Sequence, residues 1–211
     1  MSILEILDYA GVAVFAATGA LSASRKQLDI IGYLFFASVT GIGGGTIRDV
    51  VLGARPVFWV LNPTYLLVCA AVAFLLFFTA HKVESRYRLL VWLDAIGLSA
   101  YCVMGAAKGL AATGSPVVAL VAGTLTATFG GILRDLLAGE PSVLLRPEIY
   151  VTAALVGSFV FVAGVYIGLP LVASSLSGVI AAFIVRGGAL YYGWTLPTGK
   201  ALPGRHPDDV L

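Results

Sequence analysis

Charged residues are scarce in this sequence. Asp, Glu, Lys and Arg together make up 11% of its 211 residues, whereas a soluble domain carries about 25%. Hydrophobic residues make up 59% of the chain. A chain of this composition cannot cover its own surface with polar groups. The scarcity of charge therefore excludes an ordinary soluble domain and indicates a protein that is surrounded by lipid.

Residues that commonly carry chemistry are also few. The two histidines, His81 and His206, lie outside every apolar run, and no nucleophile has a base at a suitable spacing. We therefore expect no catalytic residues and no enzyme. The two cysteines, Cys69 and Cys102, are isolated within apolar runs, which is typical of buried small side chains and not of a disulfide or a metal site. Neither a metal nor a cofactor is expected.

What the sequence has instead is apolar runs of the length that crosses a bilayer, about 17–25 residues. They cover seven ranges: 3–22, 30–47, 64–80, 89–108, 116–137, 148–167 and 171–187. The connections between them are short. The first run lacks the preceding basic region of a cleaved signal peptide, so we expect it to be retained. The sequence predicts a single all-α integral membrane domain over residues 1–211, with seven transmembrane helices and a tail at 188–211.

Lysine and arginine are distributed unevenly among the connections. The first, third and fifth connections and the tail contain nine of them: Arg25, Lys26, Lys82, Arg86, Arg88, Arg146, Arg186, Lys200 and Arg205. The N-terminus and the remaining connections contain Arg55 and Lys108, if the ends of two apolar runs are left aside. By the positive-inside rule, we expect a multi-pass protein of the cell inner membrane with its N-terminus outside and its C-terminus in the cytoplasm. The net charge of +2 is then a topology signal, and no nucleic-acid partner is expected.

The chain contains an internal repeat with an offset of 86 residues. The stretch "LDYAGVAVFAATGA" at 7–20 aligns with "LDAIGLSAYCVMGA" at 93–106, and "GGTIRDVVLG" at 44–53 aligns with "GGILRDLLAG" at 130–139, without a gap between them. Self-similarity over this length indicates that the fold is built from two copies of one unit.

Each unit contains three helices, at about 4–80 and 89–167, and the helix at 171–187 is left over. Because three is an odd number, the second unit enters the membrane from the opposite side. We therefore expect inverted repeats, related by a pseudo-two-fold axis in the membrane plane. Folds of this kind place a solute path between the repeats, on discontinuous helices at matching positions.

Each unit has a glycine-rich stretch, "GIGGGTIRD" at 41–49 and "FGGILRD" at 129–135. Neither has the lysine and spacing of a P-loop, and a Rossmann turn would need a preceding strand, so nucleotide binding is not expected. Adjacent glycines lower the cost of bending or unwinding a helix, and we predict that the second and fifth helices are broken or hinged here. The alternative is that the glycines let two helices pack closely.

An Arg-Asp pair follows the glycines in both units, and charges at this depth should pair or face a cavity. Consecutive helical side chains point about 100° apart, so we expect the arginine and the aspartate to face different ways. The aspartate faces form a stripe of hydroxyls, bare backbone and carboxylate that can replace part of a cation's hydration shell. The residues proposed to line or gate a pore are Ser38, Gly43, Gly44, Gly45, Arg48, Asp49, Thr124, Thr128, Gly130, Gly131, Arg134 and Asp135.

The two arginines lie on faces of small residues, which favours a role as structural clamp or gate. An alternative for both pairs is that they only close salt bridges at helix ends. Asp8 and Asp94 recur near the start of the first helix of each unit, where they either stabilise a helix N-terminus or line an entrance. Lys108 is a lone cation at the end of the fourth helix, expected to anchor it at the interface, with a contact to a pore carboxylate as the alternative.

The seven helices, the two inverted repeats, "GGGTIRD" in the second helix and "GGILRD" in the fifth resemble the bacterial members of the trimeric intracellular cation channel (TRIC) family, also known as UPF0126 or "glycine transporter" membrane domains. The resemblance extends from about Leu4 to Arg186 and implies a homotrimer in membrane lipid, with one ion path inside each protomer. It also implies helices bent at the glycines and conduction of monovalent cations such as potassium and sodium. Animal members have a lysine-containing motif linked to phosphoinositides, but the fifth helix here reads "TATFGGILRD", so that regulation is not expected.

Two functions remain open at this point. The first is a passive monovalent cation channel, favoured by the resemblance and by the hydroxyl and carboxylate stripes. The second is a secondary transporter of a small zwitterion such as glycine, because helix N-termini can hold a carboxylate and inverted repeats are frequent among transporters.

Overall fold

The computed structural model describes residues 2–142 and 148–197. Within these ranges the regular structure is helical, with one isolated bridge between Glu148 and Thr195. The elements are α1 (Ile3–Arg25), α2 (Ile30–Val51), α3 (Phe58–Leu61), α4 (Thr64–Thr79), the 3-10 turn η1 (Ala80–Lys82), α5 (Arg86–Thr113), α6 (Pro116–Leu137), α7 (Val151–Tyr166) and α8 (Leu171–Tyr192).

All seven predicted spans are helical. Six helical stretches of the described chain are long and apolar enough to cross a membrane, whereas α7, with 16 residues, is shorter. The helix predicted to end at residue 187 continues to Tyr192, where Gly193 adopts a left-handed conformation with φ 70° and terminates it. The four-residue helix α3, in the connection between the second and third spans, was not expected from the sequence.

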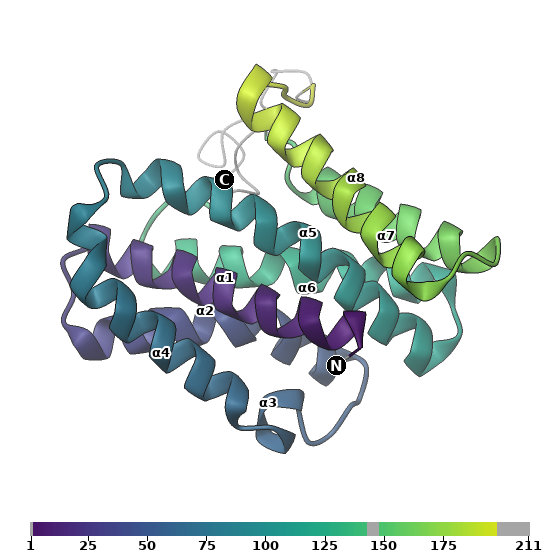
Figure 1. Cartoon of the computed structure of the whole chain (residues 1–211), viewed down its shortest axis with the longest axis horizontal. Coiled ribbons are helices and arrows are strands. Elements are labelled where there is room, and N and C mark those ends of the chain that lie inside the picture. Colours follow the sequence, from purple (N-terminus) through teal and green to yellow (C-terminus); the bar gives the residue numbers. More distant parts are fainter. Residues whose placement is uncertain (1, 143–147, 198–211) are drawn as a thin grey trace, which may run out of the picture.

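Helix α5 lies at the centre of the molecule. It packs against α1, α6, α7 and α8, while α1 also packs against α2 and α4, and α2 packs against α6. Figure 1 shows α1, α2, α5 and α6 layered over one another, with α4 crossing on one side and α7 and α8 forming a pair at the other end. Half of the 28 residues of α5 are buried, whereas only three of the 16 residues of α4 are. The core therefore forms around α5.

The 86-residue offset of the sequence recurs in the packing. Gly11 of α1 lies against the ring of Tyr101 of α5, and the equivalent Gly97 of α5 lies against the ring of Phe15 of α1. The two rings meet with their centroids 5.1 Å apart. Because each glycine leaves room for the ring from the other unit, α1 and α5 cross closely at equivalent points of the two repeats.

The break predicted at the glycine pairs is wrong, because α2 is one helix through Gly44 and Gly45, and α6 is one helix through Gly130 and Gly131. A glycine lowers the cost of leaving the helix but does not force the chain to leave it. In this structure the absent side chains serve close packing, which was the alternative interpretation.

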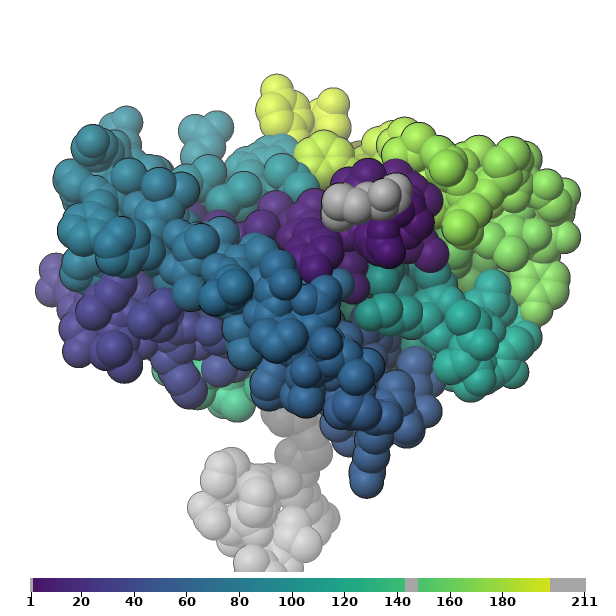
Figure 2. Space-filling view, turned by 60° about the horizontal axis from the view of Figure 1, so that its bottom comes forward, coloured from purple at the N-terminus to yellow at the C-terminus, as the bar shows by residue number. Residues whose placement is uncertain are grey.

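Large hydrophobic side chains cover much of the outside. More than half of the side-chain surface is exposed at residues of several helices, including Ile31, Phe35, Leu67, Phe74 and Ile184. Figure 2 shows the face on which the blue segment containing α3 and α4 runs from beneath the purple N-terminal part of α1 to the lower edge. An apolar exterior of this extent is what a lipid-facing surface requires.

Candidate functional site

The centre of the candidate site is the crossing of α2 and α6. A Cβ atom on Gly44 would overlap the carbonyl oxygen of Thr126, and a Cβ atom on the equivalent Gly130 would lie 2.6 Å from the carbonyl oxygen of the equivalent Thr40. The two helices therefore touch backbone to backbone, and the contact is the same from both sides. No side chain fits between them at this level.

One hydroxyl breaks the symmetry near this crossing. Tyr101 occupies the position of Phe15 in the other repeat, and its hydroxyl donates a 3.0 Å hydrogen bond to the backbone carbonyl of Gly41 on α2. Phe15 has no hydroxyl with which to hold α6 in the same way. Helix α2 therefore has a side-chain hydrogen bond to its glycine segment that links it to α5.

Five side chains form a first buried group, here called the Asp8 cluster: Asp8, Arg48, Asp49, Tyr65 and Lys108. The Asp8 carboxylate accepts a 2.9 Å hydrogen bond from the Tyr65 hydroxyl and forms a 3.3 Å ion pair with the Lys108 amine. Arg48 and Asp49 form a 2.6 Å ion pair. Lys108 belongs to the second repeat and the other four belong to the first, so the cluster joins the two repeats.

Arg48 and Asp49 lie together, contrary to the expectation that they face different ways. Their Cβ atoms do point apart, but the arginine side chain is long enough to turn back, and its Nε donates to an Asp49 carboxylate oxygen at 2.8 Å. The other Asp49 oxygen accepts a 2.9 Å hydrogen bond from the backbone N–H of Phe58. The helix fixes the direction of the Cα–Cβ bond only. The guanidinium at the end of the long arginine side chain can still move by several ångströms.

A second buried group, the Asp94 cluster, contains Asp94, Arg134, Asp135 and Tyr150. Arg134 pairs with Asp94 at 2.7 Å and with Asp135 at 2.8 Å. Arg134 is 3% exposed, and removing it would break two ion pairs of buried carboxylates. A loss of that kind costs about 3–5 kcal/mol in proteins.

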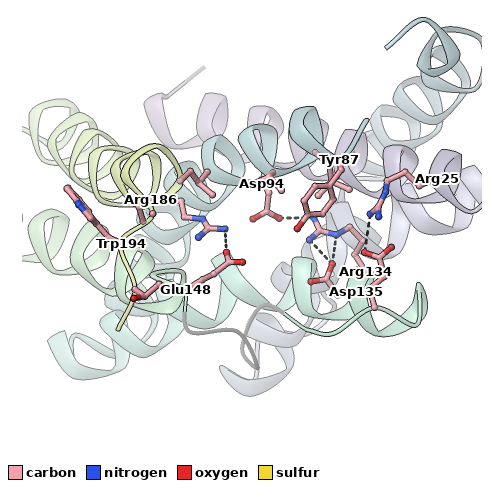
Figure 3. Close-up of a pocket in the computed structure, with 15 residues that line it drawn as sticks. Arg25, Tyr87, Asp94, Arg134, Asp135, Glu148, Arg186 and Trp194 are labelled. Carbon is pink, nitrogen blue, oxygen red and sulfur yellow. Dashed lines mark hydrogen bonds and ion pairs between the residues drawn. The ribbon is translucent and has the colours of Figure 1, made fainter. Parts of the chain in front are cut away.

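The Asp94 cluster opens into a cavity of about 290 Å³. Figure 3 shows Asp94 near the middle of the cavity lining, with Glu148, Arg186 and Trp194 to its left and Tyr87, Arg134, Asp135 and Arg25 to its right. The cavity is lined by both signs of charge, and it is large enough for several water molecules or a small hydrated ion.

The chain after α8 forms one wall of this cavity. Arg186 of α8 pairs with Glu148 at 2.9 Å, and its guanidinium lies over the ring of Tyr150, 5.0 Å from the centroid. Thr195 forms a backbone bridge with Glu148, which places the neighbouring Trp194 at the cavity. On the opposite side, Arg25 pairs with Glu140 at 3.0 Å.

The two clusters lie toward opposite ends of the molecule. Lys108 follows Asp94 by 14 positions on α5, which corresponds to about 21 Å along the helix axis. The hydrocarbon core of a bilayer is about 30 Å thick. The separation of the two clusters is therefore smaller than the thickness of the hydrocarbon core, and the crossing of α2 and α6 lies between them.

Asp8 and Asp94 do not act as helix-end residues, since both are buried and bonded to side chains of other helices. Lys108 follows the alternative interpretation and contacts the Asp8 carboxylate. The role of the hydroxyl stripe stays a prediction. The Thr124 and Thr128 hydroxyls donate to carbonyls of their own helix, and Ser38 is half-buried.

Of the residues predicted to line a pore, Arg134 and Asp135 line the cavity, together with Asp94. Gly44 and Gly130 are brought together at the crossing. Gly43 lies beside Leu133, and Gly45 and Gly131 face aromatic residues, Phe58 and Tyr150.

Sequence reasoning missed four participants: Tyr65, Tyr150, Phe58 and Arg186. A signal for the two tyrosines was present, because "NPTY" at 62–65 and "RPEIY" at 146–150 align within a residue or two of the repeat offset. A tyrosine at equivalent places beside a buried aspartate is a candidate hydrogen-bond donor. Phe58 carried no such signal, because its importance comes from the fold of a connection.

The sequence profile of the family described as "Glycine transporter" matches residues 5–81 and 91–166. The UPF0126 inner membrane protein YadS of Escherichia coli K12 is 39% identical over 197 residues, which cover 91% of this chain and 94% of that protein.

Two solved structures resemble this one closely. The TRIC trimeric intracellular cation channel orthologue from Rhodobacter sphaeroides is 52% identical, with a TM-score of 0.89 over 92% of this chain and 100% of that one. A second, described as a structural basis for conductance through TRIC cation channels, is 28% identical, with a TM-score of 0.85 over 96% of this chain and 100% of that one. By their descriptions these two relatives are ion channels and not enzymes.

Proposed function

The chain belongs to the family described as "Glycine transporter", which includes the bacterial TRIC channels, and we propose that it is a monovalent cation channel with its path inside the protomer. The observation that carries this proposal is the pair of buried charged clusters at opposite ends of one symmetric crossing of α2 and α6. Buried carboxylates on both sides of the crossing give a permeating cation a place to replace part of its hydration.

The proposed path runs from the Asp94 cavity, past the crossing of α2 and α6, to the Asp8 cluster. The cavity supports an open entrance at the Asp94 end. At the crossing, the contacts of Gly44 with Thr126 and of Gly130 with Thr40 leave no room for an ion, so this structure corresponds to a closed state. Opening requires α2 and α6 to separate or rotate there.

At the Asp8 end of the proposed path, the Asp8 carboxylate is already paired with the Lys108 amine. A permeating ion must compete with the Lys108 amine, 3.3 Å from the carboxylate, and with the Tyr65 hydroxyl at 2.9 Å. Such a contact acts as a gate, because the same carboxylate serves either Lys108 or the permeating ion. The arginines pair with the neighbouring aspartates and act as clamps that hold those carboxylates in place.

The finer points of the proposal follow the relatives. Potassium and sodium are the proposed ions, and a homotrimer with one path in each protomer is the proposed assembly, as in the relatives described as trimeric cation channels. The proposed location is the cell inner membrane, as for YadS. The excess of Lys and Arg in the first, third and fifth connections and the tail supports a cytoplasmic C-terminus.

Glycine transport is the second candidate, because the family description names it. The Asp94 cavity offers both guanidinium and carboxylate groups to a small zwitterion. The closed crossing is equally compatible with alternating access, in which only one end is open at a time.

Flux through liposomes separates the two candidates. We expect purified protein to release potassium down its gradient in proportion to the gradient, without added glycine. Saturable uptake of radiolabelled glycine, without potassium release, would instead establish the transporter. Protein-free liposomes and the Asp135→Asn variant serve as controls for leak and for dependence on the Asp94 cluster.

A further inference from the structure

We propose that Phe58 is a positioning residue that holds Lys108 against Asp8 and thereby keeps the Asp8 end of the path shut. The inference rests on the proposed function for its consequence, but the positioning itself can be measured without any ion flux. It concerns the short helix α3, to which neither the repeat nor the comparisons assign a role.

Both cations of the Asp8 cluster lie over the ring of Phe58. The Lys108 amine is 5.1 Å from the ring centroid, and the Arg48 guanidinium carbon is 5.6 Å from it. Both distances lie within the reach of a cation–π contact. The ring also meets Tyr65 edge to face, with centroids 4.8 Å apart. One aromatic ring thus touches three of the five members of the cluster.

The backbone of Phe58 is tied to the same cluster. Its N–H donates to the Asp49 carboxylate at 2.9 Å, so the ring cannot move far while that bond holds. The next residue, Trp59, donates its indole N–H to the Thr46 hydroxyl of α2 at 3.0 Å. Helix α3 is therefore fastened to α2 at two points.

Further along, Asn62 donates to the Tyr9 hydroxyl of α1 at 2.7 Å. Figure 1 shows α3 at the end of the bundle where α1 begins, which is the end that contains the Asp8 cluster. The connection from α2 to α4 thus crosses the mouth of the proposed path and carries Phe58 into it.

The ring of Phe58 is also in close contact with α2. A Cβ atom on Gly45 would lie 2.7 Å from the Phe58 ring, so the absence of a side chain on α2 makes room for the ring. If α2 moves at its crossing with α6, then Gly45 and Asp49 move with it, and Phe58 loses its contacts with both residues. Phe58 would thereby transmit a movement of α2 to Lys108, which lies on α5.

The charged groups around Lys108 show why a neutral ring matters. Asp8 attracts the amine at 3.3 Å, whereas the Arg48 guanidinium, which lies over the same ring, repels it. Asp49 is already paired with Arg48. The ring gives both cations a favourable electrostatic contact, which aliphatic side chains of similar volume cannot do.

The first test measures the reactivity of the Lys108 amine in detergent-solubilised protein. A small acylating reagent is applied for a short time, and mass spectrometry gives the ratio of modification at Lys108 to that at the exposed Lys82. We expect Phe58→Leu to raise the ratio about two- to thirty-fold, the range that corresponds to cation–π contacts. Phe58→Tyr keeps the ring and should stay within about two-fold of the unmodified protein.

A second variant displaces the ring by a change on α2. It keeps the proposal testable if the Phe58→Leu protein does not fold. Gly45→Ala places a methyl group against Phe58 and should also raise the labelling of Lys108. Its matched control is Gly131→Ala, at the equivalent position of the other repeat, where the methyl group meets the Tyr150 hydroxyl instead. Elution of each variant at the volume of the parent protein establishes assembly.

The second test records currents from the same proteins. We expect Phe58→Leu to raise the open fraction by about the same factor as the labelling. In a Lys108→Met background it should change the open fraction little, because the residue through which it acts is gone.

The outcomes separate the two proposals. Unchanged labelling of Lys108 in both Phe58→Leu and Gly45→Ala, with assembly intact, would overturn the positioning role whatever the currents show. Raised labelling without any current from the parent protein would support the positioning and reject the channel. Raised labelling with an unaltered open fraction in a conducting protein would overturn the link between Phe58 and the gate.

Discussion

Alanine at Gly44 or Gly130 tests whether the crossing of α2 and α6 is the closed constriction of the path. A Cβ atom on Gly44 would overlap the carbonyl oxygen of Thr126 and lie 3.4 Å from the backbone nitrogen of Gly130. Non-bonded carbon atoms prefer about 3.5–4.0 Å, so the helices must separate by roughly 1 Å to accept the methyl group. The atoms that the methyl group would meet belong to the backbone of α6, so no flexible side chain can move aside.

The size of the effect follows from this overlap. Overpacking of a well-filled contact costs about 1–3 kcal/mol. The preference of alanine over glycine for helix, up to about 1 kcal/mol, applies to closed and open states alike if α2 stays helical in both. The clash acts on the closed state alone, so the open fraction should rise about 5- to 150-fold. Both variants should act in the same direction because the contact is symmetric.

Single-channel recording gives the open fraction, and Gly43→Ala is the matched control. Its methyl group would meet only the end of the Leu133 side chain, at 2.7 Å, which can rotate away. The double variant of Gly44 and Gly130 should shift opening by less than the sum of the single effects, because one separation relieves both clashes. Assembled variants that open like the parent, or a Gly43→Ala effect of the same size, would refute the constriction at this crossing.

Three further predictions concern charge and topology. Asp49→Asn and Asp135→Asn should each lower the preference for cations over anions by about five-fold or more, since a unit charge at 4 Å is worth ~1 kcal/mol even in water; reversal potentials in a salt gradient that match the parent would place the path elsewhere. Arg134→Met should lower the free energy of unfolding by about 3–5 kcal/mol, because it removes the cation that pairs with two buried carboxylates; thermal unfolding in detergent measures this, and a stability equal to the parent would contradict the clamp. A cysteine in place of Ser85 should resist a membrane-impermeant thiol reagent added to intact cells, and ready labelling would overturn the cytoplasmic assignment of that connection.

The spans and the repeat could be predicted because their causes are local and periodic. Bilayer thickness sets the length of an apolar run, and every predicted span is a helix in the structure. The equivalence of Gly11 and Gly97 was visible in the sequence, and both glycines make room for an aromatic ring of the other repeat. What the alignment could not supply was the identity of those rings.

The glycine pairs show where local reasoning reaches its limit. A glycine in a helix is compatible with a bend and with a close approach, and only the neighbouring helix decides between them. The Thr126 carbonyl lies where the Gly44 side chain would be, so the structure shows the close approach, and a hinge at these glycines stays a prediction. That neighbour lies more than 80 residues away in the sequence.

The Asp8 cluster was out of reach for a related reason. The Lys108 and Asp8 positions are not equivalent in the two repeats, so the repeat alignment does not pair them. Their contact depends on how α5 crosses α1, and the contribution of Phe58 depends on the path of a connection. A contact between non-equivalent positions of the two repeats can be recognised only in the folded structure. A contact between equivalent positions can be anticipated from the repeat alignment.

The most direct test of the channel proposal is a recording from the purified protein in a planar bilayer with a potassium chloride gradient. The proposal predicts stepwise currents that reverse near the potassium equilibrium potential, and a loss of that preference in Asp135→Asn. A bilayer that contains assembled protein but shows no steps, together with saturable glycine uptake by the same preparation, would contradict the channel and establish a transporter.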